Sequence, residues 1–139
     1  MELDYLLLDP ALRGDRDRLF TLIGPLFASR RVRREMPYMH HEEGYVWSVA
    51  VTPLGEAAAM GSVDVRQGVA TLRNLYVAPA WRGCGVGRHL TDLLFGHACG
   101  HGARWMRAVA SPRAVGVFER RGFYRVSARG QYVTMELAL

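Results

Sequence analysis

The pattern of apolar and polar residues predicts a strand and then a helix in the N-terminal part of the chain. Tyr5–Leu8 is a short apolar run that ends at Asp9-Pro10, which is typical of a strand. Gly24-Pro25 should interrupt or kink the helix that follows, because proline removes a backbone donor. Five apolar residues recur at helical spacing and form one face of that helix: Leu19, Leu22, Ile23, Leu26 and Phe27.

The centre of the chain has the pattern of an antiparallel meander. Three runs rich in β-branched and aromatic residues, Tyr45–Thr52, Ala57–Val65 and Val69–Val77, are separated by short turns. The turns fall at Pro53-Leu54-Gly55 and at Gln67-Gly68. Polar residues 36–44, before the first of these strands, predict a loop.

Helices and strands alternate in the last part of the chain. Ser111-Pro112 is a good helix start, since serine can cap free amides and proline suits the first helical position. The predicted elements are a helix from Val86 closed by Gly100 and Gly102, a strand Trp105–Ala110, a helix from Ser111 to Gly122, and a hairpin of Phe123–Val126 with Tyr132–Leu137.

Length and composition predict one globular domain that spans residues 1–139. Half of the 139 residues are hydrophobic and 22% are charged, which is ordinary for a folded domain. The chain has no apolar run of about 18 residues and no basic, apolar leader at its start, so we expect a cytoplasmic protein without membrane association. Cys84 and Cys99 lack Cys-x-x-Cys spacing and should be free thiols.

The charge balance favours a polyanionic partner. Eighteen arginines stand against thirteen acids, there is no lysine, and the net charge is +5. A nucleic acid and a coenzyme A molecule with its three phosphates both satisfy this preference, so charge alone does not choose between them.

The segment Arg82–Gly87, with glycine at 83, 85 and 87, is the strongest chemical signal. It lies between a predicted strand and a predicted helix, where glycines let the backbone turn sharply and point N–H groups at an anion. The alternative is a tight turn without a ligand. A Walker loop needs Lys-Ser/Thr where this chain has Arg88-His89, and a dinucleotide fold needs parallel βαβ units in place of the meander.

Two separate segments resemble the GNAT superfamily of acyl-CoA-dependent N-acetyltransferases. Residues 74–87, Asn-Leu-Tyr-Val-Ala-Pro-Ala-Trp-Arg-Gly-Cys-Gly-Val-Gly, look like its central motif, and residues 111–123 resemble its second signature. Residues 45–137 follow the strand and helix order of that family, and residues 1–44 fit loosely. The resemblance implies an α+β, three-layer fold with a mixed, mostly antiparallel sheet that splays between its fourth and fifth strands.

The resemblance also implies acetyl-CoA as co-substrate and a set of residues that bind it. Backbone groups of Leu75 and Val77 would hold the pantetheine arm, and amides from Arg82 to Arg88 would cradle the pyrophosphate. The full set of implied cofactor-binding residues is Leu75, Tyr76, Val77, Arg82, Gly83, Cys84, Gly85, Val86, Gly87, Arg88, Ser111 and Phe118.

The acid and base of the resembled family are not at their usual positions. The base positions fall on Thr71 and Arg73, and the usual tyrosine falls on Phe118, so the catalytic groups stay unassigned. Three histidines on one predicted helix, His89, His97 and His101, lack a matching carboxylate, so we expect no metal site. The candidate substitutes are Glu42, Glu43 and Tyr124, followed by His40, His41, Asp64 and Tyr132.

Three functions fit these observations. The first is an N-acetyltransferase that moves an acetyl group directly to a primary amine of a small molecule, peptide or protein. The second is a non-catalytic, CoA-binding regulator of the same fold. The third is acetylation of charged tRNA, suggested by Arg30, Arg31, Arg33 and Arg34, although we do not expect a nucleic-acid partner. The acceptor and assembly into a homodimer stay open.

Overall fold

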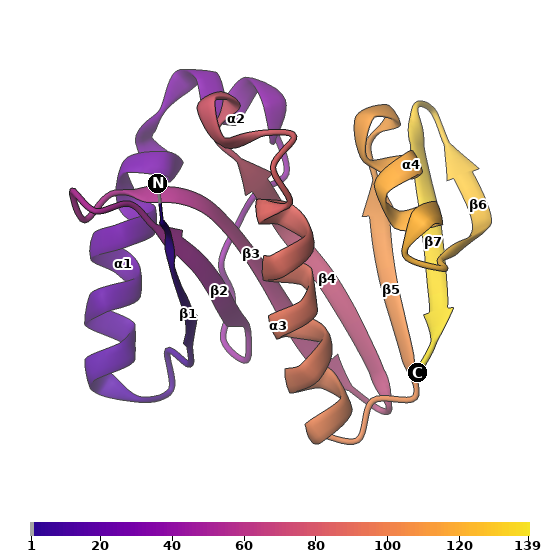
Figure 1. Ribbon diagram of the computed structural model, residues 1–139. Coiled ribbons are helices and arrows are strands. Elements are labelled where there is room, and N and C mark those ends of the chain that lie inside the picture. The colour runs from indigo at the N-terminus through magenta and orange to yellow at the C-terminus, as the bar shows by residue number, and fades with distance from the viewer. Residues whose placement is uncertain (1) are drawn as a thin grey trace.

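One mixed sheet of seven strands organises the computed structural model, which describes residues 2–139 (Figure 1). The spatial order is β1-β2-β3-β4-β5-β7-β6, and all neighbours are antiparallel except β4 and β5. The strands are β1 Asp4–Leu8, β2 Val46–Val51, β3 Ala57–Arg66, β4 Val69–Val77, β5 Trp105–Ala110, β6 Tyr124–Arg129 and β7 Tyr132–Ala138. The predicted meander and closing hairpin are therefore confirmed.

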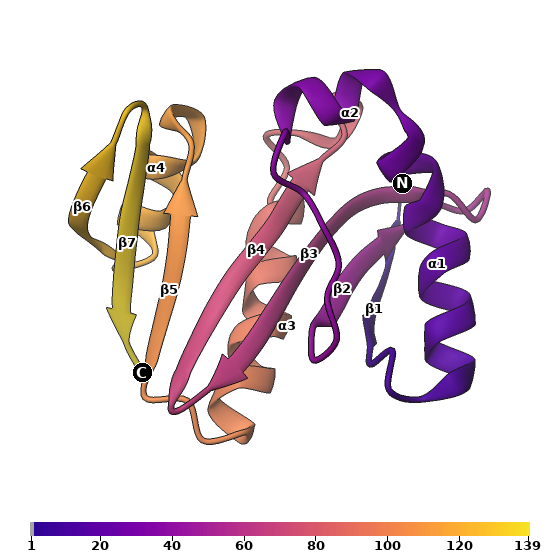
Figure 2. The ribbon, with the colours of Figure 1, turned by 180° about the vertical axis from the view of Figure 1, so that it is seen from behind.

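Helices cover both faces of the sheet (Figures 1 and 2). The helices α3 and α4 pack on one face, while α1 and α2 pack on the other. Among residues 2–139, no helix combines the length and apolar character needed to span a bilayer. The helices are α1 Arg13–Ala28, α2 Arg30–Glu35, α3 Val86–Gly100 and α4 Pro112–Arg120, with a short 3-10 helix at Pro79–Trp81.

The first helix differs from the prediction at Pro25. It continues through Gly24-Pro25 to Ala28, because the proline lies one turn from the helix end and removes only one intrahelical donor. The arginine-rich segment 30–34 forms the separate helix α2. Ser29 begins α2, since its Oγ accepts a hydrogen bond of 3.3 Å from the Val32 amide.

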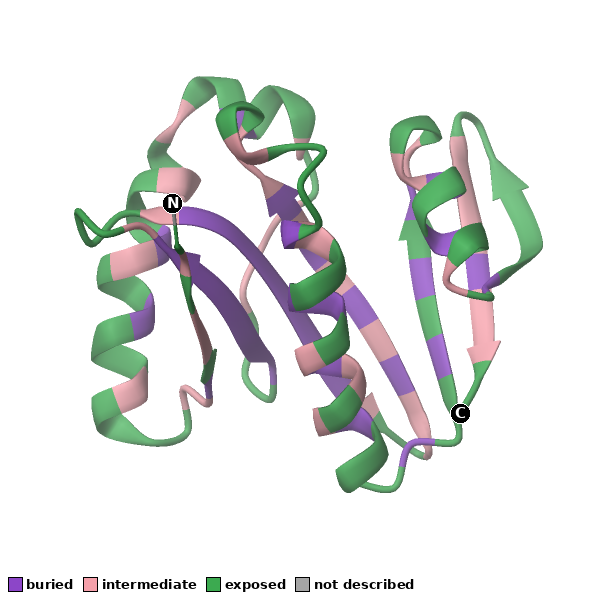
Figure 3. Cartoon of the chain, in the orientation of Figure 1, coloured by how far each residue is buried: buried purple, intermediate pink, exposed green. Residues whose placement is uncertain are grey.

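Burial is deepest where both faces of the sheet are covered. Every residue of β2 is buried, and most of β3 is buried too (Figure 3). On the α1 face, Trp47 and Met60 are fully enclosed. On the opposite face, Leu90 and Leu94 of α3 pack against the sheet. This double burial explains why these strands have near-continuous apolar sequences.

A β-bulge interrupts β4 at its centre. Ser62 of β3 pairs with Arg73, but Met60, two residues earlier on β3, pairs with Tyr76, three residues later on β4. The extra residue of β4 is accommodated at Asn74, whose backbone is left-handed, with a φ of +58°. The bulge reverses the alternation of side chains, so that Leu72 and Leu75 both pack on the α3 face.

The Asn74 side chain joins the bulge to the loop between α2 and β2. Its Oδ1 accepts from the His40 amide at 2.9 Å, and its Nδ2 donates to the His40 carbonyl at 2.8 Å. The same Nδ2 also donates to Ser62 Oγ at 2.9 Å. Three hydrogen bonds at a buried position therefore fix residue 40 beside the bulge.

The parallel strands β4 and β5 separate beyond the bulge, as the resemblance implied. They pair only over residues 69–72 of β4 and 105–108 of β5. Beyond Leu72 the two strands diverge toward the end of the sheet where α3 begins (Figure 1). Among residues 2–139, the backbone of residues 73–77 therefore has no strand partner on its β5 side.

We predict that Asn74→Gly lowers the free energy of unfolding by about 2 kcal/mol. Glycine accepts the left-handed backbone, so the loss reports the three hydrogen bonds, each of which contributes about 0.5–1.5 kcal/mol. The matched control is Gln67→Gly, which changes the other non-glycine residue with positive φ, +51°, in an exposed turn. Chemical denaturation should show Gln67→Gly neutral or slightly stabilising; equal losses in both variants would contradict the role given to Asn74.

Candidate functional site

The glycine-rich turn between β4 and α3 has the left-handed backbone that its sequence predicts. Gly83 and Gly85 have φ of +78° and +83°, and Gly85 is the residue from which α3 starts. A Cβ atom at either position would have open space around it, so backbone conformation and not crowding requires glycine here. A Cβ atom at Gly87 would lie 3.4 Å from Val77 Cγ2, because the start of α3 is close to β4.

The amides of this turn are suited to bind an anion. Within residues 2–139, the N–H groups of residues 83–88 have no acceptor, and the first intrahelical bond is from His89 N to Gly85 O at 3.0 Å. These free N–H groups lie at the N-terminal end of α3, which is the positive end of the helix dipole. This donor set fits a phosphate group, so the residues present are compatible with the pyrophosphate of CoA.

The Arg82 side chain anchors the turn instead of extending into solvent. Its Nε donates to the Val77 carbonyl at 2.8 Å, and its guanidinium donates to Glu35 of α2 at 2.8 Å. The guanidinium also lies 5.6 Å from the centre of the Tyr76 ring. The hydrogen bond from Arg82 holds the pKa of the Glu35 carboxyl below its usual value. Arg82 therefore ties the turn to β4 and to α2.

The other residues assigned to the donor site are spread over three elements. Leu75 and Val77 lie on the β4 segment that has no β5 partner, and Tyr76 is buried on the opposite face. Ser111 precedes α4 and makes no side-chain cap. Phe118 of α4 is buried in the core. Cys84 is exposed with its thiol toward the Trp81 carbonyl, Val86 is buried, and Arg88 is exposed.

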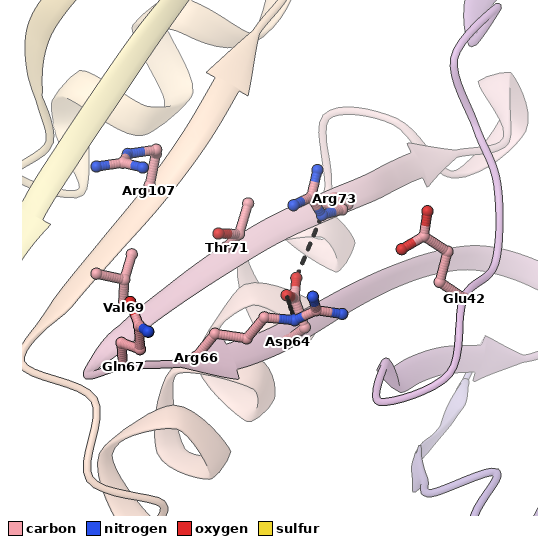
Figure 4. A pocket seen from close by; sticks show the side chains of 8 residues that line it. All are labelled: Glu42, Asp64, Arg66, Gln67, Val69, Thr71, Arg73 and Arg107. Atoms are coloured by element: carbon pink, nitrogen blue, oxygen red, sulfur yellow. Dashed lines mark hydrogen bonds and ion pairs between the residues drawn. The ribbon is translucent and has the colours of Figure 1, made fainter.

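A polar pocket of about 290 Å³ lies on the α1 face of the sheet (Figure 4). No helix covers β4, β5 and β7 on this face, and the loop after α2 crosses it (Figure 2). Thr71 and Arg73, the positions where the resemblance places a base, both face the pocket. The lining residues are Glu42, Asp64, Arg66, Gln67, Val69, Thr71, Arg73 and Arg107.

Asp64 holds two arginines side by side in this pocket. Only 6% of its side chain is exposed, and its two oxygens lie 3.2 Å from the Nε atoms of Arg66 and Arg73. Arg107 lines the pocket from β5 and pairs with Glu136 of β7 at 2.8 Å. Asp64 thus has a structural role, and the pocket presents three guanidinium groups.

His40 lies at the edge of the pocket in a defined tautomer. Its Nδ1 is 2.9 Å from the Tyr38 carbonyl, which can only accept, so Nδ1 carries the hydrogen. In the neutral ring, Nε2 then accepts from the Tyr45 hydroxyl at 2.8 Å. Glu42 Oε1 is 3.5 Å from the same Nε2. Burial raises the pKa of Tyr45, so this hydroxyl keeps its proton at pH 7.

The remaining histidines have packing roles. His41 Nδ1 accepts from Trp47 Nε1 at 3.0 Å, and burial lowers the pKa of its imidazole, so the ring is neutral at pH 7. His89 stacks on Tyr5 at 3.7 Å, while His97 and His101 stack on each other at 4.0 Å. In the part of the chain that the structure describes, no three potential ligands converge on a metal position.

The other acid and base candidates lie outside the pocket lining. Glu43 is exposed in the loop, and Tyr124 of β6 is 49% exposed. Tyr132 contacts the Tyr38 ring edge-on at 5.8 Å. The arginines of α2 at positions 30, 31, 33 and 34 are all exposed. The structure therefore brings Glu42 and Asp64 to the pocket lining, places His40 3.5 Å from Glu42, and leaves Glu43, Tyr124 and Tyr132 away from the lining.

Sequence reasoning missed Asn74, Tyr45, Arg66 and Arg107 as parts of the site. Asn74 carried one usable signal, since it follows Arg73 directly and so breaks the alternation of polar and apolar residues in β4. The other three residues look like ordinary strand or turn positions, and only the pairing of β2, β3, β4 and β5 brings them together.

Comparison with solved structures shows the same fold in several proteins. An acyl-CoA N-acyltransferase from Pseudomonas aeruginosa is 18% identical, with a TM-score of 0.76 over 99% of this chain and 100% of that one. Escherichia coli ElaA is 15% identical, with a TM-score of 0.74 over 97% of this chain and 99% of that one.

A third structure contains the coenzyme. N-acetylglutamate synthase from Neisseria gonorrhoeae, complexed with coenzyme A and N-acetyl-glutamate, is 18% identical, with a TM-score of 0.66. The match covers 100% of this chain but only 36% of that one. No curated protein matches the sequence.

The profile of the Acetyltransferase (GNAT) family matches residues 3–123, which include the β4 bulge, the glycine turn and all of α4. The match begins well before residue 45, so the N-terminal strand and helices belong to the shared fold as well. The chain is a member of the GNAT family of acyl-CoA N-acyltransferases.

Proposed function

We propose that the chain is an acetyl-CoA-dependent N-acetyltransferase that moves the acetyl group directly to a primary amine. One observation carries this proposal: the unpaired β4 segment at residues 73–77 lies between the free amides of the glycine turn and the polar pocket. A thioester held along that segment would meet an amine that enters from the pocket. The CoA and N-acetyl-glutamate bound to the Neisseria gonorrhoeae relative are consistent with this arrangement.

Backbone groups carry most of the proposed donor binding. The amides of residues 83–88 would hold the pyrophosphate, and the β4 backbone at Leu75 and Val77 would pair with the pantetheine arm as an added strand would. The Val77 carbonyl already accepts from Arg82, so its amide is the free group at that residue. Acetyl-CoA, a co-substrate, supplies the activated acetyl group.

Direct transfer requires a neutral amine. The amine nitrogen forms a bond to the thioester carbonyl carbon, the carbon–sulfur bond breaks, one proton leaves the nitrogen, and the CoA thiolate takes up a proton. A lysine-like amine is neutral in about one molecule in 2,500 at pH 7, which costs roughly 4–5 kcal/mol. A proton acceptor in the pocket would lower this barrier.

His40 and Glu42 are the proposed groups for the proton that leaves the amine. Nε2 of His40 is the ring nitrogen without hydrogen, and the Glu42 carboxylate at 3.5 Å stabilises the ring once it is protonated. Because the Nε2 lone pair already accepts from the Tyr45 hydroxyl, the proton would pass through that hydroxyl, which gives its hydrogen to Nε2, takes one from the amine and then accepts from the new N–H. Asn74 fixes the His40 backbone at the bulge, so the base is held beside the thioester. Tyr124 stays a predicted proton donor to the thiolate.

The proposed activity predicts release of free thiol from acetyl-CoA that depends on an added amine. A panel of primary amines, amino acids and peptides is tested with a thiol-reactive dye, and the acetylated product is identified by mass spectrometry. Binding of acetyl-CoA without amine-dependent thiol release across the panel would contradict the proposal and favour the non-catalytic regulator.

We predict that Gly85→Ala weakens CoA binding at least about tenfold. Alanine at φ +83° costs about 1–2 kcal/mol, so the turn would leave the conformation that aims its amides. The control is Gly96→Ala within α3, where a Cβ has open space and should stabilise the helix by up to about 1 kcal/mol. Calorimetric titration with CoA compares the two; unchanged affinity in Gly85→Ala would remove the turn from the site.

We predict that His40→Gln lowers kcat/KM about a hundredfold at neutral pH, the usual contribution of a general base. The loss should fall on kcat, because the backbone bonds that hold residue 40 to Asn74 remain. The matched control is His101→Gln at the far end of α3, which should keep the wild-type kcat/KM. An unchanged kcat/KM in His40→Gln would assign the proton to another group.

A further inference from the structure

The arginines of the polar pocket have more donors than their own carboxylates use. Arg66 and Arg73 contact Asp64 through Nε, and no terminal nitrogen of either side chain forms a hydrogen bond within residues 2–139. Their side chains are 66% and 39% exposed, so these nitrogens face the open pocket (Figure 4). Each guanidinium therefore keeps free N–H groups for a ligand.

Asp64 leaves this pair of arginines with a positive charge. One buried carboxylate holds two guanidinium groups, so the three side chains have a net charge of +1. The shared carboxylate also offsets the repulsion between the arginines, which would otherwise separate in water. Both groups are thus pre-organised side by side, and a second carboxylate would complete their charge and hydrogen bonding.

The pocket has opposite charges at its two ends. Glu42 lies at the bulge end, near His40, while Arg66 lies toward the turn between β3 and β4 (Figure 4). Thr71 lies on the other side of the Arg66 and Arg73 guanidinium groups from Glu42, with its side chain in the pocket (Figure 4). An amine beside Glu42 and a carboxylate over Thr71 would each meet the opposite charge. Arg107 faces the same space from β5.

We infer that the acceptor is an amine that also carries a carboxylate, bound by the outer edges of Arg66 and Arg73. The inference rests on the proposed N-acetyltransferase function, and it names the substrate class of the same site. Arg73 adjoins the bulge and Arg66 lies beside it on Asp64, so the two guanidinium groups together would hold the carboxylate. The arginines are specificity determinants and take no part in proton transfer.

The first test compares amino acids with their own carboxamides. Unbranched ω-amino acids of increasing length, starting at glycine, and α-amino acids are each paired with the neutral amide of the same size. For at least one pair, kcat/KM should favour the acid by about tenfold or more, which corresponds to about 1.4 kcal/mol. Equal values for acid and amide throughout the series would overturn the inference.

The second test removes the proposed anion contact. Arg66→Gln should reduce the acid-to-amide ratio of kcat/KM toward one, chiefly by raising KM for the acid. The control is Arg18→Gln on exposed α1, which removes the same charge from a distant surface and should leave the ratio unchanged. An unchanged ratio in Arg66→Gln would show that Asp64 and Arg66 form only a structural ion pair.

Binding measurements separate this inference from the proposed function. The same acids and amides are titrated calorimetrically into protein saturated with CoA. Preferential binding of acids, lost in Arg66→Gln, would support the inference even if no acetyl transfer occurred. Acetylation of amines without any preference for acids would support the proposed function and refute the inference. Absence of any preference in both binding and turnover would also refute the inference.

Discussion

The hydrogen bonds between Asn74 and the backbone of His40 are the interaction on which the candidate site depends. They bridge residues that are 34 positions apart and hold the extra residue of the β4 bulge in a left-handed conformation. Because of the bulge, residues 73–77 leave the line of β5, and their backbone becomes free for a ligand. The same bonds place the His40 ring at the edge of the pocket. One buried amide side chain therefore aligns the donor and acceptor sides.

The sheet separates the two substrates of the proposed reaction. The free amides lie in the glycine turn and the first residues of α3, whereas the polar pocket lies on the face that α1 and α2 cover only in part. The strands β4 and β5 pair firmly over residues 69–72, so the opening between them has a fixed closed end. The opening between β4 and β5 depends on backbone pairing more than on any particular side chain. Backbone pairing tolerates changes of sequence, so solved structures that are only 15–19% identical can have the same fold.

Arginine serves two different purposes in this chain, which has no lysine. Arg82 holds the glycine turn in place through its hydrogen bonds to the Val77 carbonyl and to Glu35, so its guanidinium has a structural role. Arg66 and Arg73 contact Asp64 through Nε and keep their outer N–H groups for a ligand. Net charge could not distinguish these purposes, because it does not show which groups each guanidinium contacts in the fold. Identical residues in the sequence thus differ in what they can bind.

The sequence by itself determined most of the elements, the glycine turn and the family. Period-two and helical patterns are local, and left-handed glycines act within a few residues, so Gly83 and Gly85 could be interpreted without a fold. The continuation of α1 through Pro25 was not predictable, because packing of Leu19 and Ile23 outweighs one missing donor. Only the tertiary structure decided that His40, Glu42 and Tyr45 meet beside β4, and that Arg66 and Arg73 share Asp64. Those contacts depend on strand register and on one bulge, and a local pattern contains neither of them.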